Sequence, residues 1–203
     1  MLQETPHRKR GQDPLKDSWR TPRSIFDPLN ARWGFAMDAA ADAENALADC
    51  YIDAGADALK TDWMEHLERH AAGLRPPHDP AAWLNPPYSS TIEFARRCVY
   101  SAKGGMVVVA LLPSTTDVRW FHECVLGVAT EVWHYTGRLA FVHPTTLQRV
   151  AGNATGSMLV VWTPGGPGWA GTRYGSISHT TGMPVRDEDV AYWRPPVARA
   201  ARA

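Results

Sequence analysis

The sequence contains few cysteines and no closely spaced pair of them. Cys50, Cys98 and Cys124 are the three among 203 residues, and they lie far apart in the chain. An odd number without a Cys-x-x-Cys pair indicates neither a disulfide framework nor a zinc knuckle. We therefore expect small buried thiols in a reducing compartment.

The sequence also lacks a long apolar run. No segment is long enough to cross a bilayer, and the polar, basic start of the chain has no signal-peptide hydrophobic region. We therefore expect a cytoplasmic protein with no membrane partner, and no obligatory protein partner is indicated. The 44% hydrophobic content and nine tryptophans are sufficient for the core of one domain.

An excess of charge of one sign is absent as well, because 21 basic residues balance 21 acidic ones. A zero net charge by itself counts against a nucleic-acid partner. The distribution is nevertheless uneven: residues 38–57 include six acids and no Lys or Arg, whereas residues 132–186 include four Arg and no acid. This segregation suits a protein in which the acidic segment binds the hydroxyls and the positive charge of a cofactor and the basic segment contacts phosphate. Chance clustering on solvated loops explains the charges alone equally well.

A rigid polar loop follows the apolar run at residues 82–84, with the sequence Asn85-Pro86-Pro87-Tyr88. Two prolines fix the backbone and remove two donors, so neither a helix nor a central strand continues through them. The Asn85 side-chain oxygen and the Pro86 carbonyl are two neighbouring acceptors beside the Tyr88 ring. Such a set can orient an exocyclic amine on a flat ring. A Pro-rich turn with a buried tyrosine is the plainer interpretation of the tetrapeptide.

Strand-like and helix-like patterns alternate along the chain. Strands are predicted at 35–38, 106–112, 130–135, 137–142 and 157–162, and helices at 22–33, 42–47, 64–74, 90–103 and 117–126. This alternation predicts an α/β fold with a mostly parallel sheet and a terminal antiparallel strand pair, 137–142 with 157–162. We expect a flexible basic arm at 1–16, one domain at 17–163, and a Gly/Pro-rich extension of unknown role at 164–203.

Two further patterns point to ligands. Asp38 ends a short strand and is followed by the small residues Ala39 to Ala41, as in strand–turn–helix cofactor sites, although glycines are missing. His66 and His70 lie four residues apart and could share a helix face as metal ligands do. With no third ligand evident, we interpret the two histidines as structural and predict no metal site.

The Pro-Pro loop after a strand resembles the catalytic loop of amino-group DNA methyltransferases, which use S-adenosylmethionine and a Rossmann-like fold. Together with the sequence elements on both sides of it, the loop is similar to the phage-type DNA N-6-adenine-methyltransferase (Dam) family over about residues 19–162. The matching elements are Trp19-Arg20-Thr21-Pro22, 37–41, 44–46, Asp62-Trp63, 83–88, 111–113 and 137–141. The resemblance implies methyl transfer from S-adenosylmethionine to adenine in DNA after base flipping, in the host cell of a phage or prophage.

The resemblance also implies roles for individual residues. For the cofactor, it implies contacts with Trp19, Thr21, Pro22, Asp38, Ala39 and Asn45, a hydrogen bond between Asp62 and the cofactor adenine, and stacking by Trp63. For the target base, it implies Asn85, Pro86, Pro87 and Tyr88. For DNA, we expect Arg138, Arg149 and Arg119 to contact phosphate. The first loop lacks the usual glycines, and this leaves the residue that binds the ribose open; Asp53 is a candidate. No separate target-recognition domain is evident.

The sequence is also compatible with other acceptors of the methyl group. The same loop would serve the exocyclic amine of cytosine or a glutamine amide in a protein. A non-catalytic cofactor-binding or DNA-binding module that keeps the scaffold is an alternative of another class, although the intact acceptor pair counts against it.

Overall fold

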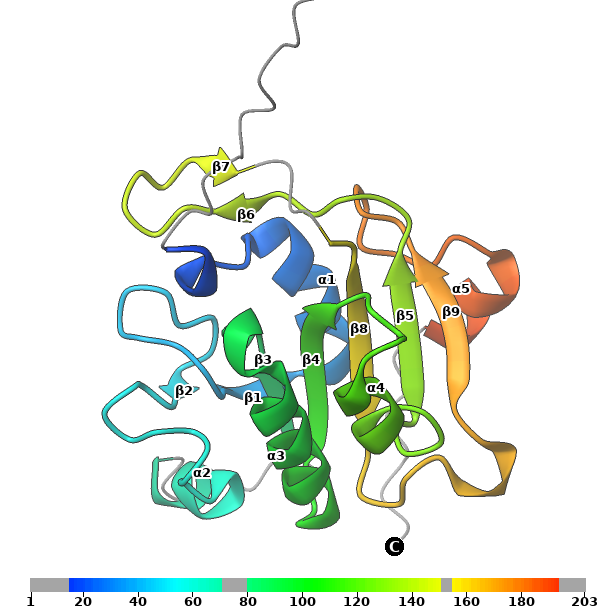
Figure 1. The fold of residues 1–203 in the computed structure, drawn as a ribbon, viewed down its shortest axis with the longest axis horizontal. Helices are drawn as coiled ribbons and strands as arrows, with labels where there is room; N and C mark the ends of the chain where they lie inside the picture. The colour runs from blue at the N-terminus through cyan, green and yellow to red at the C-terminus, as the bar shows by residue number, and fades with distance from the viewer. Residues whose placement is uncertain (1–14, 71–79, 151–154, 194–203) are drawn as a thin grey trace, which may run out of the picture.

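The structure, a computed structural model, describes residues 15–70, 80–150 and 155–193. A seven-stranded sheet has the order β2-β1-β3-β4-β8-β5-β9 (Figure 1). Its strands are β1 Phe35–Asp38, β2 Cys50–Tyr51, β3 Ala81–Leu84, β4 Val107–Pro113, β5 Glu131–Tyr135, β8 Ser157–Trp162 and β9 Arg173–Ile177. β6 Phe141–Val142 and β7 Arg149–Val150 form a separate antiparallel pair.

Helices cover both faces of the sheet. They are α1 Arg23–Trp33, α2 Trp63–His70, α3 Thr91–Lys103, α4 Arg119–Cys124 and α5 Asp187–Trp193, with short 3-10 turns η1 Lys16–Ser18, η2 Tyr88–Ser90 and η3 Gly168–Ala170. α3 and α4 pack on one face, while α1 and α5 lie against the other (Figure 1). The sheet is therefore buried between two apolar layers. None of the helices in the described ranges has the length and apolar character needed to span a bilayer.

The predicted mostly parallel α/β sheet is confirmed, but its antiparallel strand is not at the end. β8 runs antiparallel between β4 and β5, and every one of its residues is buried. Residues 141–142 pair with β7 instead of β8. A strand with five consecutive apolar residues gains most by burial on both faces, and this favours a central position for β8.

Of the two predicted helices that flank β1, one is confirmed and the other does not form. The α1 pattern is confirmed: Ile25, Phe26 and Leu29 are buried, and Gly34 ends the helix in the left-handed region at φ 59°. No helix forms at 42–47, which are turns. Asp42 and Asn45 accept each other's backbone N–H groups through their side chains, and such local bonds compete with helix formation.

The segment after residue 163, which the sequence leaves without a role, contributes to the sheet and its core. β9 pairs with β5 in parallel. Arg32 of α1 and Glu131 of β5 form a buried ion pair at 2.9 Å, and the Tyr192 hydroxyl of α5 donates to the same carboxylate at 2.9 Å. The predicted arm lies almost entirely outside the described residues, as does the end of the helix predicted at 64–74.

Candidate functional site

The order in which successive strands join the sheet reverses at β1. From β1 the chain continues to β2 on one side and then returns to β3 on the other, both parallel to β1. Ligands of open α/β sheets bind outside the carboxyl ends of the strands at such a switch point. Asp38 ends β1 opposite Trp83 of β3, and Asn85 follows directly after β3. The strand order thus brings the predicted acid and the predicted catalytic loop together.

A cavity of about 400 Å³ opens at this switch point. Residues that sequence reasoning assigned to the cofactor or the catalytic loop and that line it are Trp19, Thr21, Asp38, Asn45, Asn85 and Pro87, together with the candidate Asp53. Further lining residues, which the sequence did not single out as ligands, include Asp17, Arg20, Asp57, Ala58, Leu59 and Phe94. One wall of the cavity is therefore acidic and its floor is apolar.

Asp38 is a buried carboxylate that shapes the loop after β1. Its two oxygens accept the backbone N–H of Ala40 at 3.4 Å and of Leu47 at 3.1 Å. Burial raises the pKa of this carboxyl to about 6, although the two N–H groups oppose the shift. Asp38 therefore holds the turns at 39–47 in place while it borders the cavity.

The raised pKa of Asp38 gives a testable pH dependence. The folded protein binds this proton more tightly than the unfolded chain, so ionisation lowers stability as pH rises from about 4 through 6. Asp38→Asn removes this pH-dependent loss in the free energy of unfolding, which is on the order of 2–3 kcal/mol. We expect the stability of Asp38→Asn relative to wild type to be greater at pH 7.5 than at pH 4.5 by urea unfolding. Parallel pH profiles for the two proteins would contradict this assignment.

Two polar groups of the Trp19–Thr21 segment are buried beside the cavity without a partner among the described residues. They are Arg20 Nε and Thr21 Oγ1. Arg20 Nη2 already forms an ion pair with Glu44 at 3.1 Å, and this pair orients the guanidinium. Arg20 is a site residue that the sequence reasoning missed, although it lies inside the Trp-x-Thr-Pro element. Buried donors without partners are typical of a site that awaits a ligand.

The loop at Asn85 and Pro86 carries two acceptors that receive no hydrogen bond from the described residues. The Asn85 side chain donates from Nδ2 to the Trp19 carbonyl at 3.3 Å, which assigns Oδ1 to the other side of the amide. No described residue donates to Asn85 Oδ1 or to the Pro86 carbonyl oxygen. The loop thus carries two acceptors fixed by β3, by the prolines and by the Trp19 carbonyl.

The hydroxyl end of the Tyr88 ring is buried. Its phenol oxygen is buried near the Tyr135 and Ser157 hydroxyls, and burial raises the pKa of the Tyr88 phenol well above its usual range. The group therefore stays neutral at physiological pH and cannot act as a base. Its ring borders a second, small hollow of about 20 Å³, together with Asn85, Pro86, Phe141 and η1.

The structure separates Asp62 and Trp63 from the cavity. Trp63 is fully buried in the apolar layer beneath α3 and donates its indole N–H to the Ala58 carbonyl at 2.8 Å. Asp62 accepts the Glu65 backbone N–H at 3.0 Å and so caps α2. Neither residue lines the cavity, in contrast to the expected contacts with a cofactor adenine. Ala39, which is buried, and Pro22, which is the N-cap of α1, do not line the cavity either.

The three predicted phosphate contacts lie in different surroundings. Arg138 is exposed and forms no hydrogen bond or ion pair with any described residue, and Arg149 donates to Ser24 at 3.1 Å. Both lie around the β6–β7 pair, which projects beyond the carboxyl ends of the parallel strands (Figure 1). Arg119 instead pairs with Glu123 on the same turn of α4, and Glu123 also binds Arg96. Arg138 and Arg149 are thus the more available cations.

Known proteins resemble the chain over most of its length. A family model described as DNA N-6-adenine-methyltransferase (Dam) matches residues 8–181. A DNA N-6-adenine-methyltransferase of Escherichia phage T1 is 29% identical over 164 residues, which cover 73% of this chain and 63% of that protein. One of Haemophilus phage HP1 is 27% identical over 165 residues, covering 80% and 84%. A solved type I restriction-modification methyltransferase subunit of Streptococcus thermophilus aligns with a TM-score of 0.35 at 13% identity, over 75% of this chain and 36% of that one.

Proposed function

Because the chain belongs to the DNA N-6-adenine-methyltransferase (Dam) family, we propose that it methylates the exocyclic amine of adenine in DNA, in the host cell of a phage. The observation that carries the proposal is the acceptor pair at the end of β3. An adenine amine is a poor nucleophile because its lone pair is delocalised into the ring. Asn85 Oδ1 and the Pro86 carbonyl accept its two hydrogens and so favour the pyramidal nitrogen of the transition state.

The cavity at the switch point fits S-adenosylmethionine. When bound, this cofactor supplies an electrophilic methyl group on a sulfonium. The acids that line the cavity suit its positive charges and ribose hydroxyls, and the floor of Ala58, Leu59 and Phe94 suits an adenine ring. Arg20 Nε and Thr21 Oγ1 are donors for a carboxylate. We assign the ribose to Asp53, and the adenine to the apolar floor instead of Asp62 and Trp63.

The target base must enter beside Tyr88. The hollow there has room for about one water molecule, so a flipped adenine requires its walls to open. The covering side is η1, which is attached to the loop by a hydrogen bond from the Ser89 backbone N–H to Asp17 at 3.3 Å. We propose that this turn moves aside when the base stacks on the Tyr88 ring.

One experiment tests the activity directly. Incubating the protein with labelled S-adenosylmethionine and mixed-sequence duplex DNA should label the DNA, and nucleoside analysis should give N6-methyladenine. Label in N4-methylcytosine, or in glutamine of added protein, would show that the methyl acceptor is cytosine or a glutamine amide instead of adenine. Cofactor binding by calorimetry without label in any substrate would instead identify a non-catalytic binding module.

The DNA face can be tested at Arg138. We propose that Arg138 contacts backbone phosphate, because it is exposed, lacks a protein partner among the described residues and lies in an acid-free stretch. Arg138→Ala should weaken binding to all DNA sequences alike and reduce the slope of log affinity against log salt by about one. The measurement is fluorescence anisotropy across a salt series.

Arg119→Ala is the matched control for Arg138→Ala. Arg119 is equally exposed, but its charge is already paired with Glu123, so its loss should leave the salt slope nearly unchanged. Equal slopes for wild type and Arg138→Ala, with a lowered melting temperature for the variant, would place the DNA face elsewhere.

A further inference from the structure

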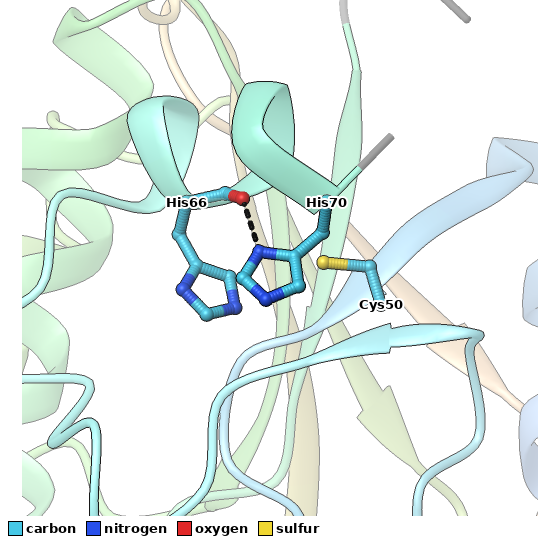
Figure 2. A group of neighbouring side chains, drawn as sticks. All are labelled: Cys50, His66 and His70. Carbon is cyan, nitrogen blue, oxygen red and sulfur yellow. Dashed lines mark hydrogen bonds between the residues drawn. The ribbon is translucent and has the colours of Figure 1, made fainter. Parts of the chain in front are cut away.

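Three metal-ligating side chains converge on the side of β2 that faces α2. His66 and His70 come from successive turns of α2, and Cys50 comes from β2 (Figure 2). One donor atom of each residue lies within 4.8 Å of the other two. The sequence spacing suggested two of these ligands, and the fold supplies the third, which lies 16 residues before His66 in the chain.

A backbone carbonyl lies against one nitrogen of each imidazole. His70 Nδ1 lies 2.8 Å from the His66 carbonyl, drawn as the dashed line in Figure 2, so that Nδ1 carries the proton and Nε2 keeps its lone pair. For His70 this is the usual arrangement of a metal-ligating histidine, with a carbonyl bound to the remote ring nitrogen. His66 Nε2 lies 3.0 Å from the Tyr51 carbonyl and is the ring nitrogen that faces His70 in Figure 2, so an ion bound to Nε2 replaces this hydrogen bond. The two rings lie stacked at 4.1 Å.

The spacing is close to that of a tetrahedral site. Zinc–nitrogen and zinc–sulfur bonds of about 2.0–2.3 Å place donor atoms roughly 3.4–3.6 Å apart. The cluster must therefore close by roughly 1 Å, and the exposed His70 side chain can rotate to do so. The same side chains line an open pocket of about 560 Å³ that includes Asp49 and Asp53. A carboxylate or a water molecule can thus complete the four ligands.

We propose that Cys50, His66 and His70 bind a zinc ion that fastens β2 to α2. One thiolate and two imidazoles favour Zn²⁺ over Mg²⁺ or Ca²⁺, and the thiol proton is released to solvent on binding. β2 has two residues and pairs with β1 in the sheet order, so it is a weakly held edge. Asp53, two residues after β2, lines both this pocket and the cavity at the switch point. The ion therefore supports the wall of that cavity without touching it.

The test uses the untagged full chain, stripped with a chelator and then titrated with Co²⁺ as a probe for Zn²⁺. We expect one ion per chain, d–d bands of a tetrahedral site, and a thiolate-to-cobalt charge-transfer band. Cys50→Ser should lose the charge-transfer band while Cys98 and Cys124 remain in the chain. His70→Gln, on the exposed helix surface, should weaken binding by at least about tenfold. Zn²⁺ alone should displace the cobalt and raise the melting temperature.

His122→Ala is the matched control, because His122 is exposed on α4 away from the cluster. It should bind Co²⁺ as the wild type does. Circular dichroism of each metal-free variant checks that the chain is folded. The proposal is overturned if the wild type binds no Co²⁺, or if Cys50→Ser and His70→Gln, both folded, reproduce the wild-type spectrum and affinity. Methyl transfer is not part of this readout, so the outcome is independent of the proposed function.

Discussion

Replacing Asn85 with alanine should reduce methyl transfer by about 100-fold to 1,000-fold while cofactor affinity stays within about threefold. The variant removes one of two fixed acceptors for the amine, and the Pro86 carbonyl alone cannot hold both hydrogens. The loss appears in the rate of the chemical step because the interaction strengthens in the transition state. Single-turnover methylation and calorimetric titration with S-adenosylmethionine measure the two quantities separately.

Asn45→Ala is the control within the same cavity. The Asn45 side chain closes the turn at 42–45 and lines the cofactor cavity, away from the acceptor pair. We expect it to raise the KM for the cofactor with little change in kcat. Turnover of Asn85→Ala within a few-fold of wild type would remove Asn85 from the reaction. A large loss of cofactor affinity in Asn85→Ala would show that Asn85 lines the cofactor cavity and has no role in the chemical step.

Elements with one strong local pattern were predictable from the sequence. The strand predicted at 157–162 has the bounds of β8, because the five consecutive apolar residues that follow Ser157 can be buried in a central strand. The helix before Gly34 ends where a residue free to adopt positive φ is needed. The Pro-Pro loop was predictable because two prolines leave few alternative conformations.

Features that depend on distant partners were not predictable. The pattern at 137–142 gives no sign that β7 would be its partner or that β8 would insert between β4 and β5, since register and order arise from packing across the whole sheet. The helix expected at 42–47 does not form because Asp38 and Asp42 accept local backbone N–H groups. The third member of the His66–His70 cluster, Cys50, becomes visible once α2 folds against β2.

Trp63 is a residue for which the family resemblance and the burial of the side chain point to different roles. An acid followed by tryptophan suits a hydrogen bond and a stacking ring, and the sequence contains no information on which way the ring turns. In the structure the Asp62 carboxylate caps α2 while the Trp63 ring enters the core. Two apolar residues that do line the cavity, Ala58 and Leu59, lie five and four positions before Trp63.

Trp63→Ala should therefore lower the free energy of unfolding by about 3–5 kcal/mol, the usual cost of truncating a large buried aromatic side chain. The ring is fully buried, and its loss leaves a cavity and the Ala58 carbonyl without its donor. Urea unfolding measures the change. Trp169→Ala is the matched control, because that ring is fully exposed and its removal should alter stability by less than about 0.5 kcal/mol.

Trp63→Phe separates a core role from cofactor stacking. It keeps an aromatic ring and removes the indole N–H, so it should destabilise the fold by about 1–2 kcal/mol and leave the affinity for S-adenosylmethionine unchanged in the folded protein. If Trp63 stacked on the cofactor adenine, Trp63→Ala would instead weaken cofactor binding by about 1–3 kcal/mol with little loss of stability. Calorimetry on the folded variants, at a temperature well below their melting transitions, decides between a ring that supports the cavity from the core and one that contacts the ligand.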